Sequence, residues 1–168
     1  MMTIDYITQA DCSREQLLEI CRFKNLNWHY PIESHLAWLD RNLLPDDTHV
    51  LLSDGNTLVG YLNIVNLVLD TDGTPQPALG IGNVCVHPAY KGFSLGALLM
   101  SAAKYYCRRN NRIGILLCQD KNTAFYNACN WHRFGGTVSI PSHDNTTHIN
   151  FYSTVPLSCK TLNCNRDF

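Results

Sequence analysis

The sequence has no apolar run long enough to cross a bilayer and no excess of charge of either sign. Its most apolar stretch, residues 58–69, is interrupted by Gly60, Asn63 and Asn66, and the N-terminus lacks a basic region followed by an apolar run. We therefore expect no membrane span and no targeting segment, and a cytoplasmic location. Thirteen Lys and Arg against fourteen Asp and Glu give a net charge of −1. Because no overall field attracts nucleic acid or an anionic membrane, we expect a small-molecule partner.

The chain also lacks CxxC pairs, although it contains eight cysteines. Several of them lie in apolar segments, which favours free thiols over a disulfide framework. His143, His148, Cys159 and Cys164 have spacings within the range of zinc ligands, so a zinc-stabilised interaction domain is an alternative hypothesis. The favoured interpretation is a polar hairpin loop followed by a loosely held C-terminal tail at residues 155–168, with no metal site.

No linker, repeat or low-complexity segment divides residues 1–168, so we expect a single domain. The N-terminal half predicts a strand, two helices and two strands. The first helix begins at Asp11 or at Ser13, where Gln16 completes a capping box, and it ends near Asn25. The other elements expected here are a strand at 3–8, a helix at 32–44 and strands at 50–53 and 58–69.

The second half alternates strands and helices after a loop at residues 70–77. The elements expected there are a strand at 79–86, a helix at 94–109, a strand at 113–118, a helix at 122–129, and strands near 133–140 and 148–154. Antiparallel strands followed by a βαβ unit predict a mixed sheet in an α/β fold.

The most informative stretch runs from Gly82 to Gly96, where an apolar strand enters a small-residue turn and then an apolar helix. Gly92, Ser94 and Gly96 let consecutive backbone N–H groups face one concavity, at the positive end of the helix dipole. This pattern predicts an anion cradle that fits a pyrophosphate. The spacing matches neither GxxxxGK[ST] nor GxGxxG, which disfavours a P-loop and a dinucleotide fold. A turn of this kind also occurs where it merely tightens a strand–helix junction.

Residues 84–96, VCVHPAYKGFSLG, resemble the pyrophosphate loop of the GCN5-related N-acetyltransferase (GNAT) superfamily, Q/R-x-x-G-x-G/A after a strand of the form V-x-V-x-P. Lys91 stands at the Gln or Arg position, Ser94 at the first glycine and Gly96 at the second. Lysine keeps a positive charge beside the diphosphate, whereas serine tolerates a positive φ less well than glycine. The residues that the resemblance implies for coenzyme A binding are Cys85, Val86, Lys91, Gly92, Phe93, Ser94, Leu95, Gly96, Ala97 and Asn122.

A second block, LLCQDKNTAFYNACNW at residues 116–131, resembles the family's following strand and helix, which end in Y-x-x-x-G-F. Tyr126 falls on the tyrosine, Asn130 replaces the glycine and Trp131 the phenylalanine. Asparagine is the next-best residue for a left-handed helix end. The interval before Tyr126 is short, so the helix is expected to lack a turn. The resemblance covers residues 79–131, and within the superfamily this block looks more like aminoglycoside 2'-N-acetyltransferases than like histone enzymes.

The resemblance implies a mixed, mostly antiparallel central sheet of six to seven strands with helices on both faces. It further implies an N-acetyltransferase that moves an acetyl group from acetyl-CoA to a primary amine of a small molecule by direct transfer in a ternary complex. The backbone of Cys85 and Val86 would bind the pantetheine arm and the thioester oxygen, and Tyr126 would protonate the departing thiolate. The alternative for Tyr126 is a core aromatic on an amphipathic helix.

The general base is left open by the sequence. Residues 79–86 contain no Asp or Glu, which leaves His87, Glu33, Asp70 or a water chain ordered by Asn83. His87 would otherwise cap a turn, and Glu33 would otherwise favour a helix dipole.

Three further hypotheses remain at this stage. Cys85 and His87 share a strand face, which would allow a ping-pong reaction through an acyl-cysteine, although apolar surroundings raise a thiol pKa. Trp28, Tyr30 and Trp38 line an acceptor pocket or pack in the core. A non-catalytic module that binds coenzyme A is the alternative function. We expect neither nucleic-acid nor membrane partners, and a homodimer is left open.

Overall fold

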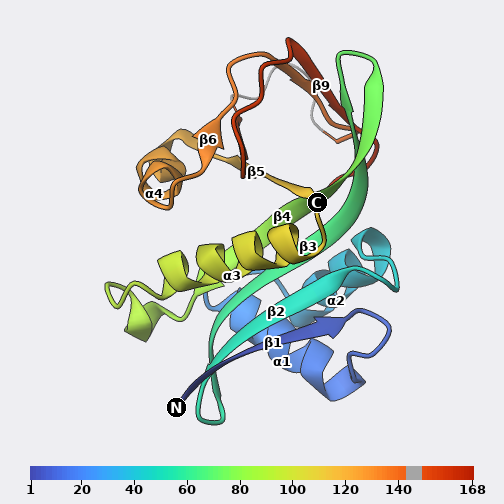
Figure 1. Cartoon of the computed structure of the whole chain (residues 1–168). Helices are drawn as coiled ribbons and strands as arrows, with labels where there is room; N and C mark the ends of the chain where they lie inside the picture. Colours follow the sequence, from blue (N-terminus) through green and yellow to red (C-terminus); the bar gives the residue numbers. More distant parts are fainter. Residues whose placement is uncertain (143–148) are drawn as a thin grey trace. The chain divides into compact units, whose positions relative to one another are not determined.

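The computed structural model describes residues 1–142 and 149–168, which form two compact units. Unit 1 comprises residues 1–65 and 82–102, and unit 2 comprises residues 66–81 and 103–168. Strands β3 (Thr57–Thr71) and β4 (Thr74–Val86) and helix α3 (Leu95–Arg109) contribute to both units (Figure 1). That residues 1–168 form a single domain stays a prediction, and each unit is described by itself.

The remaining strands are short. They are β1 (Met2–Thr8), β2 (Thr48–Asp54), β5 (Ile113–Cys118), β6 (His132–Arg133), β7 (Thr137–Ser139), β8 (Asn150–Ser153) and β9 (Thr161–Cys164). Among the described residues, nine strands form one sheet in the order β1-β2-β3-β4-β5-β8-β6, with β9 beside β3 and β7 beside β9. The pairs β4–β5 and β7–β9 are parallel, and the pairs β1–β2, β2–β3, β3–β9, β5–β8 and β6–β8 are antiparallel. The mixed, mostly antiparallel sheet is confirmed, with more strands than the six or seven expected.

Helices α1 (Arg14–Asn25) and α2 (Ile32–Asn42) begin where their capping residues predict. The Ser13 side chain accepts the Gln16 N–H at 3.2 Å, and the Gln16 side chain accepts the Ser13 N–H at 2.9 Å. This is the predicted capping box, which satisfies two otherwise unpaired donors. Helix α2 follows Pro31 and stops two residues earlier than predicted, since the Leu44 N–H donates to the Asp47 carboxylate at 2.8 Å instead.

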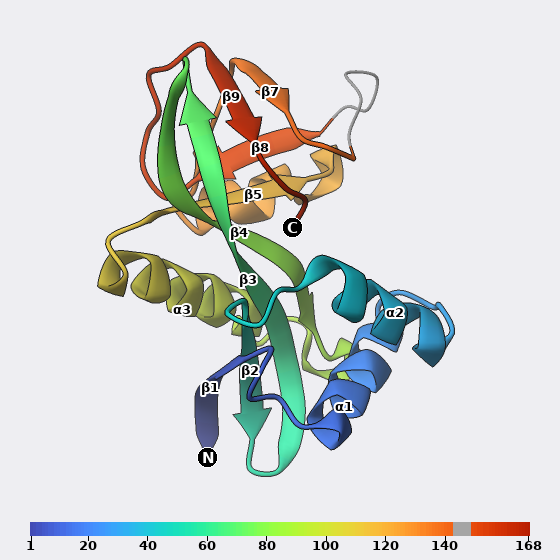
Figure 2. The same cartoon turned by 90° about the vertical axis from the view of Figure 1, so that its right-hand side faces the viewer.

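Helices cover both faces of the unit 1 strands. Figure 2 shows α1 and α2 on one side of β1–β3 and α3 on the other. Helix α3 lies close to β3, because a Cβ added at Gly60 would approach Leu99 Cδ1 to 2.9 Å. The Tyr6 hydroxyl of β1 also donates to the Ala102 carbonyl at 3.1 Å. The predicted helices on both faces are thus present in this unit.

The loop expected at residues 70–77 is a tight hairpin instead. Strand β3 continues to Thr71 and β4 begins at Thr74, joined by Asp72 and Gly73, both with positive φ. Pro75 and Pro77 lie within β4 but precede its pairing with β5, which begins at Ala78. An extended strand tolerates proline where no ladder donor is needed.

The prediction of a loosely held tail at residues 155–168 is wrong, because these residues contain β9. Strand β9 pairs with β3 from Leu69↔Cys164 to Thr71↔Leu162. Asp72 accepts hydrogen bonds from the N–H groups of Lys160 and Thr161 at 2.7–3.0 Å, and Leu162 is buried in a core cluster with Phe151. These contacts, which are distant in sequence, hold β9 in place.

The strand predicted at 133–140 is divided into β6 and β7. Gly135 and Gly136 separate them, and a Cβ at Gly136 would lie 2.3 Å from the Lys160 carbonyl oxygen. The chain therefore bends where it closely approaches another backbone. The short helix α4 (Thr123–Ala128) follows a 3-10 turn at Asp120–Asn122, as the expected missing turn implies. Within the described residues, no helix is long and apolar enough to span a bilayer.

Candidate active site

The predicted anion cradle lies at the start of α3 in unit 1. A 3-10 turn, Pro88–Tyr90, leads into a loop in which Gly92 and Ser94 have φ values of 89° and 61°. The Leu98 N–H donates to the Ser94 carbonyl at 3.1 Å, and this bond opens the helix. The amides of Leu95, Gly96 and Ala97 precede it, so they have no acceptor within the helix and carry the positive end of its dipole.

The loop is open to solvent, as a diphosphate site requires. Residues 91–94 are exposed, and Phe93 is 72% exposed. A Cβ on Gly92 would meet nothing within 4 Å, so glycine is favoured there by its φ rather than by crowding. These residues fit the diphosphate of coenzyme A.

Ser94 holds a conformation that suits glycine better, and this gives a test of the loop. Replacing Ser94 with glycine should stabilise the protein by about 1 kcal/mol, raising Tm by about 2–4 °C, because a left-handed L-residue is strained. Coenzyme A affinity should not fall. Calorimetry measures both quantities. Asn130→Gly is the control, since Asn130 is also left-handed, with φ 58°, but lies in unit 2. A loss of affinity in Ser94→Gly alone would show that the serine side chain itself binds the ligand.

The end of β4 places Cys85 and Val86 just before the cradle. Cys85 is buried, and burial raises the pKa of its thiol to about 12, although the Lys24 charge partly opposes this shift. The thiol is therefore protonated at neutral pH and is a poor nucleophile. His87 does not activate it, because His87 Nδ1 accepts the Ala89 N–H at 3.1 Å and caps the 3-10 turn.

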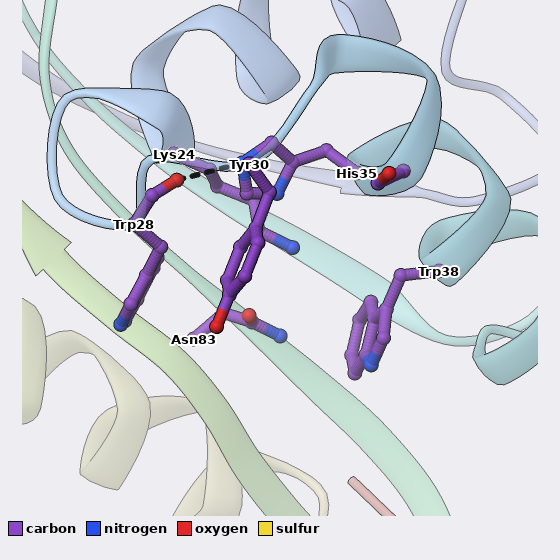
Figure 3. Close-up of a pocket in the computed structure, with 7 residues that line it drawn as sticks. Lys24, Trp28, Tyr30, His35, Trp38 and Asn83 are labelled. Atoms are coloured by element: carbon purple, nitrogen blue, oxygen red, sulfur yellow. Dashed lines mark hydrogen bonds between the residues drawn. The ribbon is translucent and has the colours of Figure 1, made fainter.

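A cavity of about 230 Å³ opens in the same unit. Its lining residues are Lys24, Trp28, Tyr30, Ser34, His35, Trp38 and Asn83. Figure 3 shows the side chains of Trp28, Tyr30 and Trp38 extending from the helical side toward β4, where Asn83 lies. Asn83 is two residues before Cys85, a separation of about 7 Å along a strand. The cavity and the predicted donor-binding residues thus share one strand.

The polar groups of the cavity are fixed by buried hydrogen bonds. His35 is 4% exposed, and its Nε2 donates to the Trp28 carbonyl at 3.0 Å, which leaves Nδ1 as an acceptor in the neutral ring. Burial lowers the His35 pKa. Asn83 has a φ of 52° and donates to the Asn63 amide oxygen at 2.6 Å. The buried Asn63 Nδ2 has no hydrogen-bond partner among the described residues.

Three of the four general-base candidates do not line the cavity of unit 1. His87 caps a turn, and Glu33 is exposed in the first turn of α2 and is not among the residues lining the cavity. Asp70 lies in unit 2 and accepts the Gly73 N–H of the hairpin at 2.8 Å. Of these candidates only Asn83 lies at the cavity, and His35 is a titratable cavity residue that the sequence did not indicate.

Tyr126 lies in unit 2, on α4, and is 7% exposed. Burial raises the pKa of its hydroxyl, and the neighbouring Cys118 and Cys129 add to the shift. Its ring centroid lies 5.9 Å from that of Tyr152. Asn122 immediately precedes α4, and Asn130 has the predicted left-handed conformation after it. Both the proton-donor and the core-packing interpretations of Tyr126 are compatible with this placement.

Lys24 is the functional candidate that the sequence reasoning missed. It lines the cavity, is 3% exposed, and its Nζ lies 4.4 Å from the centroid of the Trp38 ring. A signal was present, because Leu17, Ile20, Cys21 and Lys24 follow the i, i+3, i+4, i+7 pattern of the buried face of α1. A lysine at such a position predicts that its ammonium group is buried in the protein.

The zinc hypothesis concerns residues only partly described. His143 and His148 lie outside the described residues, and the eight cysteines are all free thiols. No cluster of three or more metal-binding side chains occurs in the described parts of the chain.

Comparisons with known proteins agree with the fold. Residues 14–134 match the family model described as the acetyltransferase (GNAT) family. No curated protein was found to match the sequence. Among solved structures, ElaA from Escherichia coli is similar, with a TM-score of 0.64 and 20% identity, covering 91% of this chain and 98% of that one.

Two further structures resemble the chain over nearly its whole length. An acyl-CoA N-acyltransferase from Pseudomonas aeruginosa has a TM-score of 0.67 and 16% identity, with coverage of 92% and 100%. The N-acetyltransferase YlbP from Bacillus subtilis, in complex with coenzyme A, has a TM-score of 0.60 and 18% identity, with coverage of 93% and 97%. These low identities show a shared fold, and the family match, which extends over most of the sequence, shows that this chain belongs to the acetyltransferase (GNAT) family.

Proposed function

We propose that the protein is an N-acetyltransferase that moves an acetyl group from acetyl-CoA to a primary amine of a small molecule. Acetyl-CoA is the acyl donor consistent with the family and with the coenzyme A complex of the Bacillus subtilis relative. The observation that carries the proposal is the shared strand β4, which has Asn83 at a cavity and Cys85 and Val86 just before an anion cradle. Donor and acceptor sites would thus lie on one element.

The chain's own residues supply binding, orientation and one proton. The amides at 95–97 and Lys91 would hold the diphosphate, and the backbone at Cys85 and Val86 would hold the pantetheine arm. The thioester of the bound donor supplies an activated acyl carbon. The acceptor amine attacks that carbon, the C–S bond breaks, and the amine proton leaves to a base or water. The resemblance assigns Tyr126 the role of protonating the thiolate.

Direct transfer is favoured over an acyl-cysteine intermediate. Burial raises the pKa of Cys85 to about 12, and His87 is held as a turn cap. A thiol in this state forms too little thiolate to compete with an amine that is already bound.

A small acceptor is favoured by the size of the cavity. Its volume of about 230 Å³ is below the roughly 300–1,000 Å³ typical of sites for drug-sized ligands. The cytoplasmic location, a homodimer and the nearness to aminoglycoside enzymes stay predictions.

The proposal is tested by measuring acetyl-CoA binding and transfer separately. Acetyl-CoA should raise Tm by mass action, and a panel of small primary amines should include at least one that releases free coenzyme A thiol above background. Binding without transfer to any amine would identify the alternative, a non-catalytic module. Absence of acetyl-CoA binding would contradict both functions.

Lys91 provides a narrower test of the donor site. Lys91→Ala should weaken coenzyme A binding by less than tenfold and reduce its dependence on salt, because the contact is Coulombic and exposed. Titration calorimetry at two ionic strengths measures this. Lys121→Ala, a change at an exposed lysine in unit 2, is the control and should alter neither value. An unchanged salt dependence in Lys91→Ala would remove Lys91 from the site.

A further inference from the structure

Lys24 is a buried cation without an anionic partner. It is 3% exposed and lines the cavity of unit 1, with its Nζ 4.4 Å from the centroid of Trp38. Within residues 1–142 and 149–168, no carboxylate lies within ion-pair distance of it, and none of the side chains lining the cavity is acidic. Buried charges are normally paired, because an unpaired one is poorly solvated. An anionic group placed in this cavity would therefore be stabilised by Lys24.

The ionisable groups around Lys24 are neutral near pH 7. Those that interact electrostatically with it are Cys21 on its own helix, Cys85 on β4, His35 on α2 and His49 on β2. Burial raises the pKa of both thiols and lowers the pKa of both imidazoles, that of His49 to about 4. Lys24 is thus the single charge of an otherwise uncharged, aromatic-walled cavity.

This charge pattern selects among amine acceptors. A polycation such as a polyamine or an aminoglycoside needs carboxylates and would be repelled by Lys24. A dianionic phosphate would leave surplus negative charge in a cavity that offers one positive charge. A monoanionic carboxylate matches Lys24 in charge, and an apolar body matches the indole and phenol rings of Trp28, Tyr30 and Trp38.

The position of Lys24 also suits the proposed transfer. Lys24 lines the same cavity as Asn83, which lies on β4, the strand assigned to the thioester. In an amino acid, the carboxylate and the amine are attached to the same carbon. An acceptor whose carboxylate lies at Lys24 therefore has its amine beside β4.

We propose that this cavity binds an acceptor that carries a carboxylate beside its primary amine and an apolar or aromatic body, with Lys24 binding the carboxylate. The acceptor class is then the apolar α-amino acids and close analogues. This inference rests on the proposed function, because the bound molecule is an acceptor only if the protein transfers an acetyl group. The binding of the carboxylate can be tested without any transfer.

The test uses ligand pairs that differ only in the carboxylate. The probes are N-acetyl derivatives of phenylalanine, tryptophan and leucine, each compared with the N-acetyl derivative of its decarboxylated amine. None of these probes has an amine that titrates. Calorimetry at pH 7 with coenzyme A present should show at least one acid binding tenfold or more tightly than its neutral partner. Neutral partners that bind as tightly as the acids, or no binding of any acid, would overturn the proposal.

Variants locate the effect at Lys24. Lys24→Met keeps the length of the side chain, removes the charge and should reduce the acid-to-neutral preference to less than threefold, with folding checked by circular dichroism. Lys104→Met is the matched control. Lys104 also lies near an indole, 5.8 Å from the Trp131 centroid, but it is in unit 2 and donates to the carbonyls of Cys129 and Asn130. An acid preference that survives in folded Lys24→Met would overturn the assignment.

The pH dependence gives a second readout. Burial lowers the pKa of Lys24 to about 8, so its charge is present below pH 8 and is lost as the pH rises above it. Affinity for the acid should be constant from pH 6.5 to 7.5 and fall about tenfold by pH 9.5, whereas affinity for the neutral partner should not change. An acid affinity that stays constant to pH 9.5 would contradict the role of Lys24.

Transfer assays separate this inference from the proposed function. If 2-phenylethylamine or spermidine is acetylated faster than every amino acid tested, the proposed function stands and the acceptor class is wrong. If no amine is acetylated but the acid probes bind through Lys24, the cavity assignment stands and the proposed function fails.

Discussion

Replacing Tyr126 with phenylalanine should lower kcat by about 10²- to 10⁴-fold while leaving acetyl-CoA affinity unchanged. The reason is that the change removes only the hydroxyl that we propose as proton donor to the thiolate, and general acids contribute effects of this size. Burial raises the pKa of this hydroxyl. It therefore stays protonated over the whole working range, and the alkaline limb of a pH–rate profile should not report Tyr126.

Tyr126→Phe should lower activity without lowering the free energy of unfolding. No hydrogen bond of the Tyr126 hydroxyl occurs among the described residues, so the phenylalanine leaves no partner unpaired. Tyr152→Phe is the matched control, because Tyr152 is a buried neighbour on β8 and should lose stability at most, not activity. If Tyr126→Phe keeps more than half of the wild-type kcat while chemistry limits the rate, Tyr126 is not the proton donor.

The sequence predicted local features well, because they depend on neighbouring residues. The capping box of Ser13 and Gln16 and the left-handed Asn130 are each decided within a few positions of the chain. The strand, the small-residue turn and the helix of residues 82–96 are also contiguous and form as predicted, whereas diphosphate binding there stays a prediction. Caps, turns and helix ends can be predicted without a structure, because they depend on residues that are close in sequence.

Features that depend on distant contacts were missed. Strand β9 forms because Asp72 binds the backbone of residues 160 and 161 and because Leu162 enters a core built from β3, β5 and β8. The residues next to β9 in sequence predict neither the hydrogen bonds to Asp72 nor the burial of Leu162. The start of β4 at Thr74 was missed in the same way, because a strand tolerates proline only where no ladder donor is needed, and the neighbouring strands decide those positions.

The cavity of unit 1 was only half predicted from the sequence. The aromatic residues between the first two helices were recognised, but Lys24, on the buried stripe of α1, was not. His35 was overlooked because a histidine in a helix gives no sign of its burial. The cavity's charge, on which the proposed acceptor class rests, becomes visible only when α1, α2 and β4 are placed together in unit 1.

Replacing Gly96 with valine should weaken coenzyme A binding at least tenfold, about 1.4 kcal/mol. Gly96 lies in the first turn of α3, where the amides at 95–97 would contact the diphosphate. A β-branched side chain there would prevent the close approach that short N–H to phosphate bonds require. The helix itself should not suffer, because valine has a higher helix propensity than glycine. We therefore expect the variant to lose coenzyme A affinity and to keep its folding stability.

Variants with side chains of increasing size test the Gly96 prediction further. Gly96→Ala should cause a smaller loss than Gly96→Val, because it adds one methyl group instead of a branched side chain. Ser101→Val places the same side chain at an exposed position one turn further along α3 and should not change the affinity. Calorimetry with coenzyme A and thermal melts of each variant separate binding from folding. A folded Gly96→Val protein with wild-type affinity would show that the diphosphate does not lie against the first turn of α3, and the donor site would need reassignment.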